Sequence, residues 1–133
     1  MRQTLNELIA RMPFNRLLGL RVARTHRDGI TIECTLREEL HNMAGVLHGG
    51  VTATLADAAV GMAIHHHFKG VRRATTVEMK INYFLPIDHG KVRARAHLIR
   101  TGSTLCAGRV DIFDARKRLA GAALVTYMLL PNA

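Results

Sequence analysis

The sequence is poor in several residue types, and each scarcity removes a class of protein. Its 133 residues include two Cys, three Pro and no Trp. Cys34 and Cys106 cannot build a disulfide framework, and they favour a reducing compartment. No apolar run approaches the length of a membrane-spanning helix, and the first residues lack the apolar segment of a secretory signal. We therefore expect a cytoplasmic location and no membrane partner.

Most motifs for cofactor or nucleophile chemistry are also missing. The chain has no G-x-x-x-x-G-K-[ST] phosphate loop and no G-x-G-x-x-G dinucleotide fingerprint. Its single serine, Ser103, lies outside any G-x-S-x-G elbow. The consecutive run His65–His67 cannot converge on one ion from a helix, because neighbouring side chains point about 100° apart. We expect no metal and no cofactor.

Acidic residues are few relative to basic ones. Nineteen Lys and Arg against ten Asp and Glu give a formal net charge of +9. This excess favours anionic partners, whether nucleic acid, an acidic membrane or a phosphate-bearing small molecule. Yet Leu40 to Phe68 contains no Lys or Arg, and Asp57 is its one acid. Because a carboxylate in an apolar stretch costs desolvation free energy, Asp57 is either a functional group or a surface residue of a helix.

Helical spacing predicts two helices. Thr4–Glu7 has the pattern of a capping box, and a short amphipathic helix follows until Pro13 ends it. Residues 49–66 form a longer run that is rich in Ala, Val and Gly and contains no proline. Its small side chains would let another backbone approach closely, so we expect this helix to be buried.

Alternating apolar and polar residues predict the strands. Runs near 20–22 and 30–37 are joined by a hairpin turn at Asp28-Gly29. The remaining strands are expected near 77–85, 92–98, 105–113 and 119–129, and the last two are apolar enough to be central. This order predicts one α+β domain over residues 1–133, an antiparallel sheet wrapped around a long central helix. Since one helix covers one sheet face, the other face or the edges would need a second subunit.

A glycine-rich segment leads into the long helix. Asn42 and His48 stand beside glycines, and Gly49 and Gly50 fall where unpaired N–H groups could polarise a carbonyl. Asp57 lies about 12 Å further along the helix axis, too far to act on that same carbonyl within one subunit. In a symmetric dimer, Asp57 of one subunit could approach Gly49 of the other. A plain helix entry, with a capping Asn and a core histidine, explains these residues equally well.

These residues resemble the hotdog-fold acyl-CoA thioesterases, and within them the phenylacetate-pathway (PaaI-like) branch. The matching pattern is Asn42, then Gly45-x-x-His48-Gly49-Gly50, then Leu55-Ala56-Asp57. Thr76-Val77-Glu78-Met79-x-x-x-Tyr83-x-x-Pro86 and Pro13–Gly19 are similar to two further family segments. The similarity covers nearly the whole chain.

The resemblance implies a hotdog fold, dimers paired edge to edge and commonly tetramers. Asp57 would be the catalytic nucleophile or general base, and the Gly49 N–H would polarise the thioester carbonyl. His48 and Asn42 would orient the thioester and a water molecule. Thr76, or alternatively Thr75, would supply a hydroxyl beside the nucleophile. Gly50 is grouped with the residues expected to contact the substrate.

The expected substrate is an aryl- or short/medium-chain acyl-CoA. On charge alone, Arg72, Arg73, Arg100 and Lys117 are candidates to contact its nucleotide. The main alternative is a non-catalytic acyl-CoA sensor or regulator on the same fold, which would not need Asp57. Acyl-thioester hydratases and dehydratases use other local motifs. Nucleic-acid binding rests on charge alone, with four Phe, two Tyr and no recognition motif, so we expect no nucleic-acid partner.

Overall fold

A computed structural model describes residues 4–131, so residues 1–3 and 132–133 of the predicted domain lie outside the described residues. Its elements run α1 (Leu5–Arg11), α2 (Pro13–Leu18), β1 (Arg21–His26), β2 (Gly29–Thr35), a 3-10 turn (Glu38–Leu40), α3 (Gly49–His67), β3 (Ala74–Tyr83), β4 (Lys91–Thr101), β5 (Leu105–Phe113) and β6 (Leu119–Leu129). The strands form one antiparallel sheet in the order β1-β2-β4-β5-β6-β3. The predicted α+β class and central position of the last two strands are confirmed.

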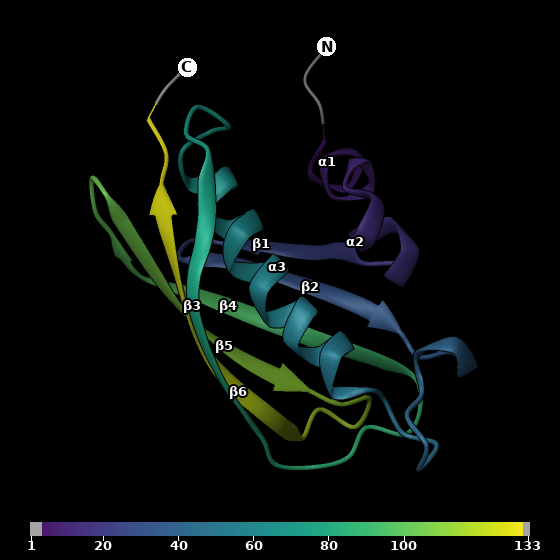
Figure 1. The fold of residues 1–133 in the computed structure, drawn as a ribbon. Coiled ribbons are helices and arrows are strands. Elements are labelled where there is room, and N and C mark those ends of the chain that lie inside the picture. The colour runs from purple at the N-terminus through teal and green to yellow at the C-terminus, as the bar shows by residue number, and fades with distance from the viewer. Residues whose placement is uncertain (1–3, 132–133) are drawn as a thin grey trace.

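Helix α3 lies in the curve of the sheet, as Figure 1 shows. Leu55, Val60 and Ile64 are at most 1% exposed and pack with the inward side chains of the sheet. Gly108 of β5 leaves room for this contact, since a Cβ atom there would lie 2.8 Å from Val60 Cγ2. The predicted long buried helix is confirmed, and it ends one residue later than expected.

The N-terminal segment contains one helix more than the sequence predicts. Thr4 accepts a hydrogen bond from the Glu7 N–H while the Glu7 carboxylate accepts one from the Thr4 N–H, so the predicted capping box is confirmed. Pro13 ends the first helix but also begins a second, α2, as its first residue. Proline suits that position because its missing N–H would have no helical partner there.

The hairpin between β1 and β2 also differs slightly from the prediction. Its turn residues are Arg27 and Asp28, and Gly29 already belongs to β2, opposite His26. Gly29 is needed for another reason: a Cβ atom there would lie 2.0 Å from the carbonyl oxygen of Ala96 on β4. The glycine therefore permits close strand approach and does not form the turn.

Strand β3 lies at one edge of the sheet. Among the described strands it pairs with β6 alone, and a bulge at Val77 interrupts the register. The bulge breaks the predicted alternation, and Val77 and Tyr83 are 51% and 53% exposed. The β3 backbone groups on the side away from β6 form a free edge, the kind of edge that pairs with another chain.

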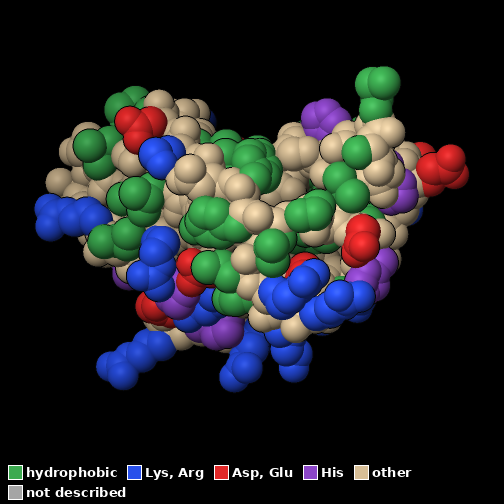
Figure 2. Space-filling view, turned by 90° about the horizontal axis from the view of Figure 1, so that it is seen from below, with side chains coloured by type: hydrophobic (Ala, Val, Ile, Leu, Met, Phe, Trp, Pro, Cys, Tyr) green, Lys and Arg blue, Asp and Glu red, His purple; other side chains and the backbone are tan. Residues whose placement is uncertain are grey.

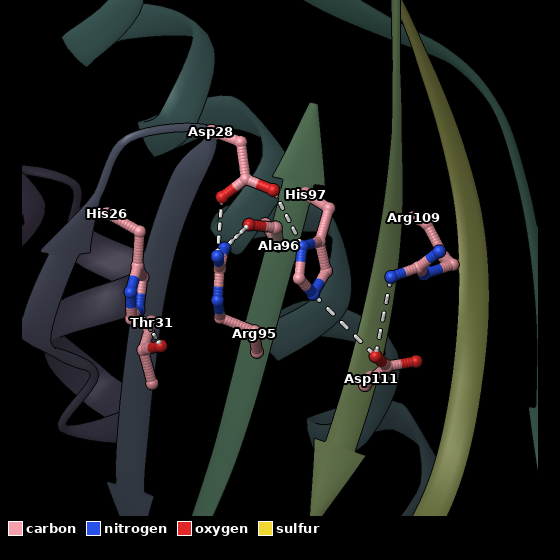
Figure 3. A network of polar contacts seen from close by, with 8 residues as sticks. All are labelled: His26, Asp28, Thr31, Arg95, Ala96, His97, Arg109 and Asp111. Carbon is pink, nitrogen blue, oxygen red and sulfur yellow. Dashed lines mark hydrogen bonds and ion pairs between the residues drawn. The ribbon is translucent and has the colours of Figure 1, made fainter. Parts of the chain in front are cut away.

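The sheet face opposite α3 carries a network of ion pairs, drawn in Figure 3. Arg95 and His97 of β4 both bond to Asp28, and the second nitrogen of His97 lies 3.7 Å from Asp111 of β5. The Arg95 hydrogen bond, followed by that of His97, holds the pKa of Asp28 well below its usual range. Much of the positive charge on this face is thus already paired within the chain.

The end of the molecule where β3 finishes and β6 begins is more apolar. Figure 2 shows hydrophobic side chains across the middle of this end and Lys and Arg side chains along its lower margin. Phe84 and Leu85, which follow β3, are 54% and 36% exposed. No helix in residues 4–131 has the length and hydropathy to cross a membrane.

Candidate functional site

A cavity of about 870 Å³ opens beside the middle of α3, where Asp57 lies. Its walls come from the two N-terminal helices, one side of α3, the start of β3 and Tyr127 of β6. The apolar part of the lining includes Leu8, Met12, Phe14, Ala58 and Met62. A partly buried carboxylate thus faces a space with both apolar and charged walls.

The Asp57 carboxylate is held through one of its two oxygens. Thr76 Oγ1 donates to Asp57 Oδ1 at 2.7 Å, and the Tyr127 hydroxyl lies 2.9 Å from the same oxygen. That hydroxyl is also 2.8 Å from the Asp57 backbone carbonyl oxygen. Two hydroxyl groups thus converge on one oxygen and fix the orientation of the carboxylate. Of the two threonines considered from sequence, Thr76 makes this contact, whereas Thr75 lines the cavity.

Tyr127 reaches Asp57 from the inner face of β6. It is 8% exposed, and its burial raises the pKa of its phenol. The nearby Thr76 hydroxyl lowers that pKa somewhat, while the Asp57 charge raises it. The phenol therefore stays protonated and remains a hydrogen-bond donor.

Gly61 leaves the space in which the Tyr127 hydroxyl lies. It follows Asp57 by one helical turn, and a Cβ atom at this position would lie 2.6 Å from the Tyr127 hydroxyl oxygen. Glycine inside a helix ordinarily costs stability relative to alanine. Here the missing side chain leaves the space that the phenol occupies.

The helix entry is organised by local hydrogen bonds. His48 caps α3 by accepting the Gly50 N–H at its Nδ1, 2.8 Å away. Asn42 Oδ1 accepts the N–H groups of Ala44 and Val46 at 2.9 and 3.3 Å. The alternative from sequence, a capping Asn42 and a core histidine, is therefore wrong in both parts. The cap is His48, and its side chain is exposed. Both side chains shape the loop before the helix.

Gly49 lines a second cavity, of about 380 Å³, at the start of α3. The Tyr83 hydroxyl donates to the Gly49 carbonyl oxygen at 2.7 Å. The Gly49 N–H, at the first position of the helix, has no acceptor within the part of the chain that the structure describes. This N–H is available to a ligand carbonyl, whereas that of Gly50 is used by His48.

Asp57 and Gly49 do not meet within one chain. They line different cavities and are separated by two turns of the same rigid helix, about 12 Å along its axis. Arg72 and Arg73 line the Asp57 cavity and donate to the carbonyl oxygens of Leu130 and Pro131. The other two cationic candidates are not brought together. Arg100 lies near the end of β4, beside the start of β5, and Lys117 lies in the turn that follows β5.

The three consecutive histidines occupy the last turn of α3. His65 is partly buried and lines the Asp57 cavity, and burial, followed by the charge of His66, lowers the pKa of the His65 ring. His66 and His67 are exposed and lie at a smaller cavity beside the β1–β2 turn. Within residues 4–131, no group of three His, Cys, Asp or Glu side chains is arranged to hold a metal ion.

Tyr127 and Gly61 were missed from the sequence. The signal for Tyr127 was its inward position in the alternating strand, between Val125 and Leu129, because a buried phenol needs a hydrogen-bond partner. The signal for Gly61 was a glycine inside a helix, one turn after the lone acid. Neither signal names the partner, which comes from a distant segment of the chain.

The curved antiparallel sheet around a central helix defines the hotdog class of fold. The family model of the thioesterase superfamily matches residues 44–120, which include His48, Gly49 and Asp57. The chain belongs to this superfamily, a family of thioester hydrolases.

Two named relatives and one solved structure are similar along most of the chain. Human acyl-coenzyme A thioesterase 13 is 36% identical over 118 residues, covering 84% of this chain and 84% of the relative. The medium/long-chain acyl-CoA thioesterase YigI of Escherichia coli is 26% identical over 133 residues, covering 89% and 86%. The crystal structure of a thioesterase from Haemophilus influenzae superposes with a TM-score of 0.89. At 23% identity and coverage of 98% and 92%, this last match shows likeness of fold.

Proposed function

We propose that the protein hydrolyses an aryl- or short/medium-chain acyl-CoA to the free acid and CoA, as a member of the PaaI-like branch. One observation carries this proposal: an Asp57 carboxylate held by two hydroxyls at the wall of the 870 Å³ cavity. The names of the two relatives support acyl-CoA as the substrate class. We further propose that residues 1–133 act as one hotdog domain.

Asp57 acts on the thioester in one of two ways. As a general base it takes a proton from water, whose oxygen attacks the carbonyl carbon; as a nucleophile it attacks directly and water cleaves the resulting anhydride. In both, the carbonyl oxygen gains negative charge, which a helix N-terminal N–H such as that of Gly49 stabilises. The C–S bond then breaks, and the CoA thiolate takes up a proton. His48 and Asn42 hold the loop that aims Gly49, and Thr76 holds Asp57.

The complete site requires two copies of the chain. Because Asp57 and Gly49 line separate cavities, each Asp57 needs the Gly49 of a partner. The free edge of β3 supports an edge-to-edge dimer, since it offers unpaired backbone groups and an exposed Val77. We propose that two such dimers form a homotetramer. The two buried free thiols, Cys34 and Cys106, support a location in the reducing cytoplasm.

The negative charge of the CoA phosphates is complementary to the positive charge of the arginines that line the Asp57 cavity. Arg72 and Arg73 line it, so the CoA phosphates would lie near these guanidinium groups while the acyl group occupies the apolar part. Arg100 and Lys117 lie near opposite ends of β5, so they would contact the nucleotide from different directions or in different subunits. Thr75 and Gly50 complete the proposed substrate contacts.

The test is thioester hydrolysis by the purified chain and one matched pair of variants. Release of free thiol is followed with phenylacetyl-, benzoyl-, butyryl-, hexanoyl- and octanoyl-CoA. Asp57→Asn keeps the side-chain shape but removes the charge, and it should lower kcat about 10²- to 10⁴-fold, the usual effect of losing a positioned general base. Asp111→Asn, on the opposite sheet face, is the control and should retain wild-type kcat.

Two results would overturn this function. If the wild-type chain binds acyl-CoA but releases no thiol, the protein is a sensor or regulator on the same fold. If Asp57→Asn hydrolyses the best substrate as fast as the wild type, the carboxylate is not the catalytic group.

A further inference from the structure

The hydrogen bonds of Asp57 are unequally shared between its two carboxylate oxygens. Both Thr76 and Tyr127 contact Oδ1, at 2.7 and 2.9 Å. Neither of these two hydroxyls contacts Oδ2. One oxygen is thus fixed by two hydroxyl groups, and the other is left for water or substrate.

We propose that Tyr127 is a positioning residue: with Thr76, its hydroxyl fixes Oδ1 of Asp57 and leaves Oδ2 to act on water or the thioester carbon. This inference rests on the proposed function of Asp57. It assigns a role to a residue on β6 that lies 70 positions away in the sequence from the carboxylate it orients. Tyr127 does not touch the reacting atoms in this scheme; it acts through Asp57.

The chemistry of the phenol favours the carboxylate as its acceptor. A tyrosine has one hydroxyl hydrogen, and two Asp57 oxygens lie within 3 Å of it, one from the backbone and one from the side chain. The ionised carboxylate is the stronger acceptor of the two. Because the pKa of the phenol is raised by burial, the hydrogen stays in place through the neutral and alkaline range.

The position of the phenol is fixed from several sides. Tyr127 is 8% exposed and its strand neighbour Leu129 is 4% exposed, so both side chains lie in the core. Gly61 contacts the hydroxyl end, where an added Cβ atom would lie 2.6 Å from the oxygen. The tyrosine ring therefore has little freedom to leave Asp57.

The two arginines just before β3 form hydrogen bonds with the backbone that follows β6. Arg72 and Arg73 donate to the carbonyl oxygens of Leu130 and Pro131. The two hydroxyls of Thr76 and Tyr127 both contact Oδ1 of the carboxylate. This oxygen is thus held by two neutral donors.

The first test compares Tyr127→Phe with Val125→Ala. Phenylalanine keeps the ring and removes the hydroxyl, so we expect kcat to fall about tenfold, the effect of one hydrogen bond to a charged group, while KM changes less than about twofold. Val125→Ala removes a buried side chain from the same strand at a position outside the lining of the Asp57 cavity. It should lower the melting temperature and leave the kcat of the folded enzyme unchanged.

The second test uses Gly61→Ala alone and in the Tyr127→Phe background. Alone, the added methyl group pushes the hydroxyl away from Asp57 and should lower kcat with little change in KM. In the Phe background there is no hydroxyl to displace, so Gly61→Ala should change kcat much less.

The outcomes separate this inference from the proposed function. If Tyr127→Phe has wild-type kcat, or if Val125→Ala lowers kcat as much, Tyr127 is a structural residue and the inference is wrong. Equal losses from Gly61→Ala in both backgrounds would overturn it too. Failure of the proposed function looks different, because Asp57→Asn would then be as active as the wild type.

Discussion

The start and the middle of α3 carry the two different groups that the proposed reaction uses. In the middle of the helix, the Asp57 side chain is fixed by hydroxyls from two distant strands. At its start, Gly49 offers a backbone N–H, and its surroundings are fixed by local turns and by Tyr83. Both the Asp57 carboxylate and the Gly49 N–H are positioned by residues of the same chain, yet about 12 Å of rigid helix separates them. The comparison teaches that one chain holds both parts of the site but cannot bring them together.

This separation is the reason for proposing a role for the β3 edge. No change of side-chain rotamer brings together two groups that are two helical turns apart, so in the proposed site a second copy supplies the missing group. The edge offered by β3 is long, and the bulge leaves Val77 exposed on it. In the proposed dimer, the interface brings Asp57 of one copy to Gly49 of the other, so loss of assembly should also mean loss of catalysis.

A charge placed on this edge should have a large effect on both assembly and activity. Val77→Lys puts a positive charge on the edge of each copy, and symmetric pairing brings two such charges into one interface. At micromolar protein we expect dissociation on a sizing column and a loss of activity of about 10- to 100-fold. Specific activity should rise again with protein concentration, because mass action restores the dimer.

The concentration dependence is the control in that experiment. Val77 adjoins Thr76, so a direct effect on the site would lower activity equally at every protein concentration. A variant that runs as a monomer with full activity would show that Asp57 and Gly49 need no partner.

A smaller effect should distinguish Tyr83, at the start of α3, from Tyr127, beside its middle. Burial raises the pKa of both Tyr127 and Tyr83, and Tyr127 is much the more buried. A phenol with a raised pKa in the folded state stabilises the fold below about pH 10, and this stability is lost as pH rises towards the folded pKa. One such group contributes at most about 1.4 kcal/mol per pH unit.

Urea unfolding between pH 9 and 11 measures this difference. The free energy of unfolding of the wild type should decline with pH, and Tyr127→Phe should flatten the decline more than Tyr83→Phe. Equal slopes for the three proteins would mean that neither phenol titrates differently in the folded and unfolded chains.

Much of the fold could be predicted because the spacing of apolar residues and the helix-capping patterns depend on neighbouring positions in the sequence. The long helix and the six strands follow from spacing alone. The second helix, α2, escaped because Pro13 is both a stop for one helix and a favoured first residue of the next. The role of Gly29 escaped because its constraint comes from Ala96, a residue on another strand.

The candidate site was predictable where its residues are neighbours in sequence. Asn42, His48, Gly49 and Asp57 stand close together in the chain, and the resemblance names them as a group. Tyr127 could not be found in this way, because its contact with Asp57 exists only once β6 lies beside α3. Arg100 and Lys117 do not join Arg72 and Arg73 at the Asp57 cavity, because charge alone does not say where in the fold a residue lies.

The most direct test of the account is complementation between two inactive chains. Asp57→Ala removes the carboxylate, and Gly49→Pro removes the N–H at the first helical position, where proline is tolerated. Each variant alone should be inactive. When they are co-expressed in equal amounts, half of the dimers are mixed and each has one intact site of two, so about a quarter of wild-type activity should return. Mixed dimers that form but show no activity above the two parents would contradict a site shared between subunits.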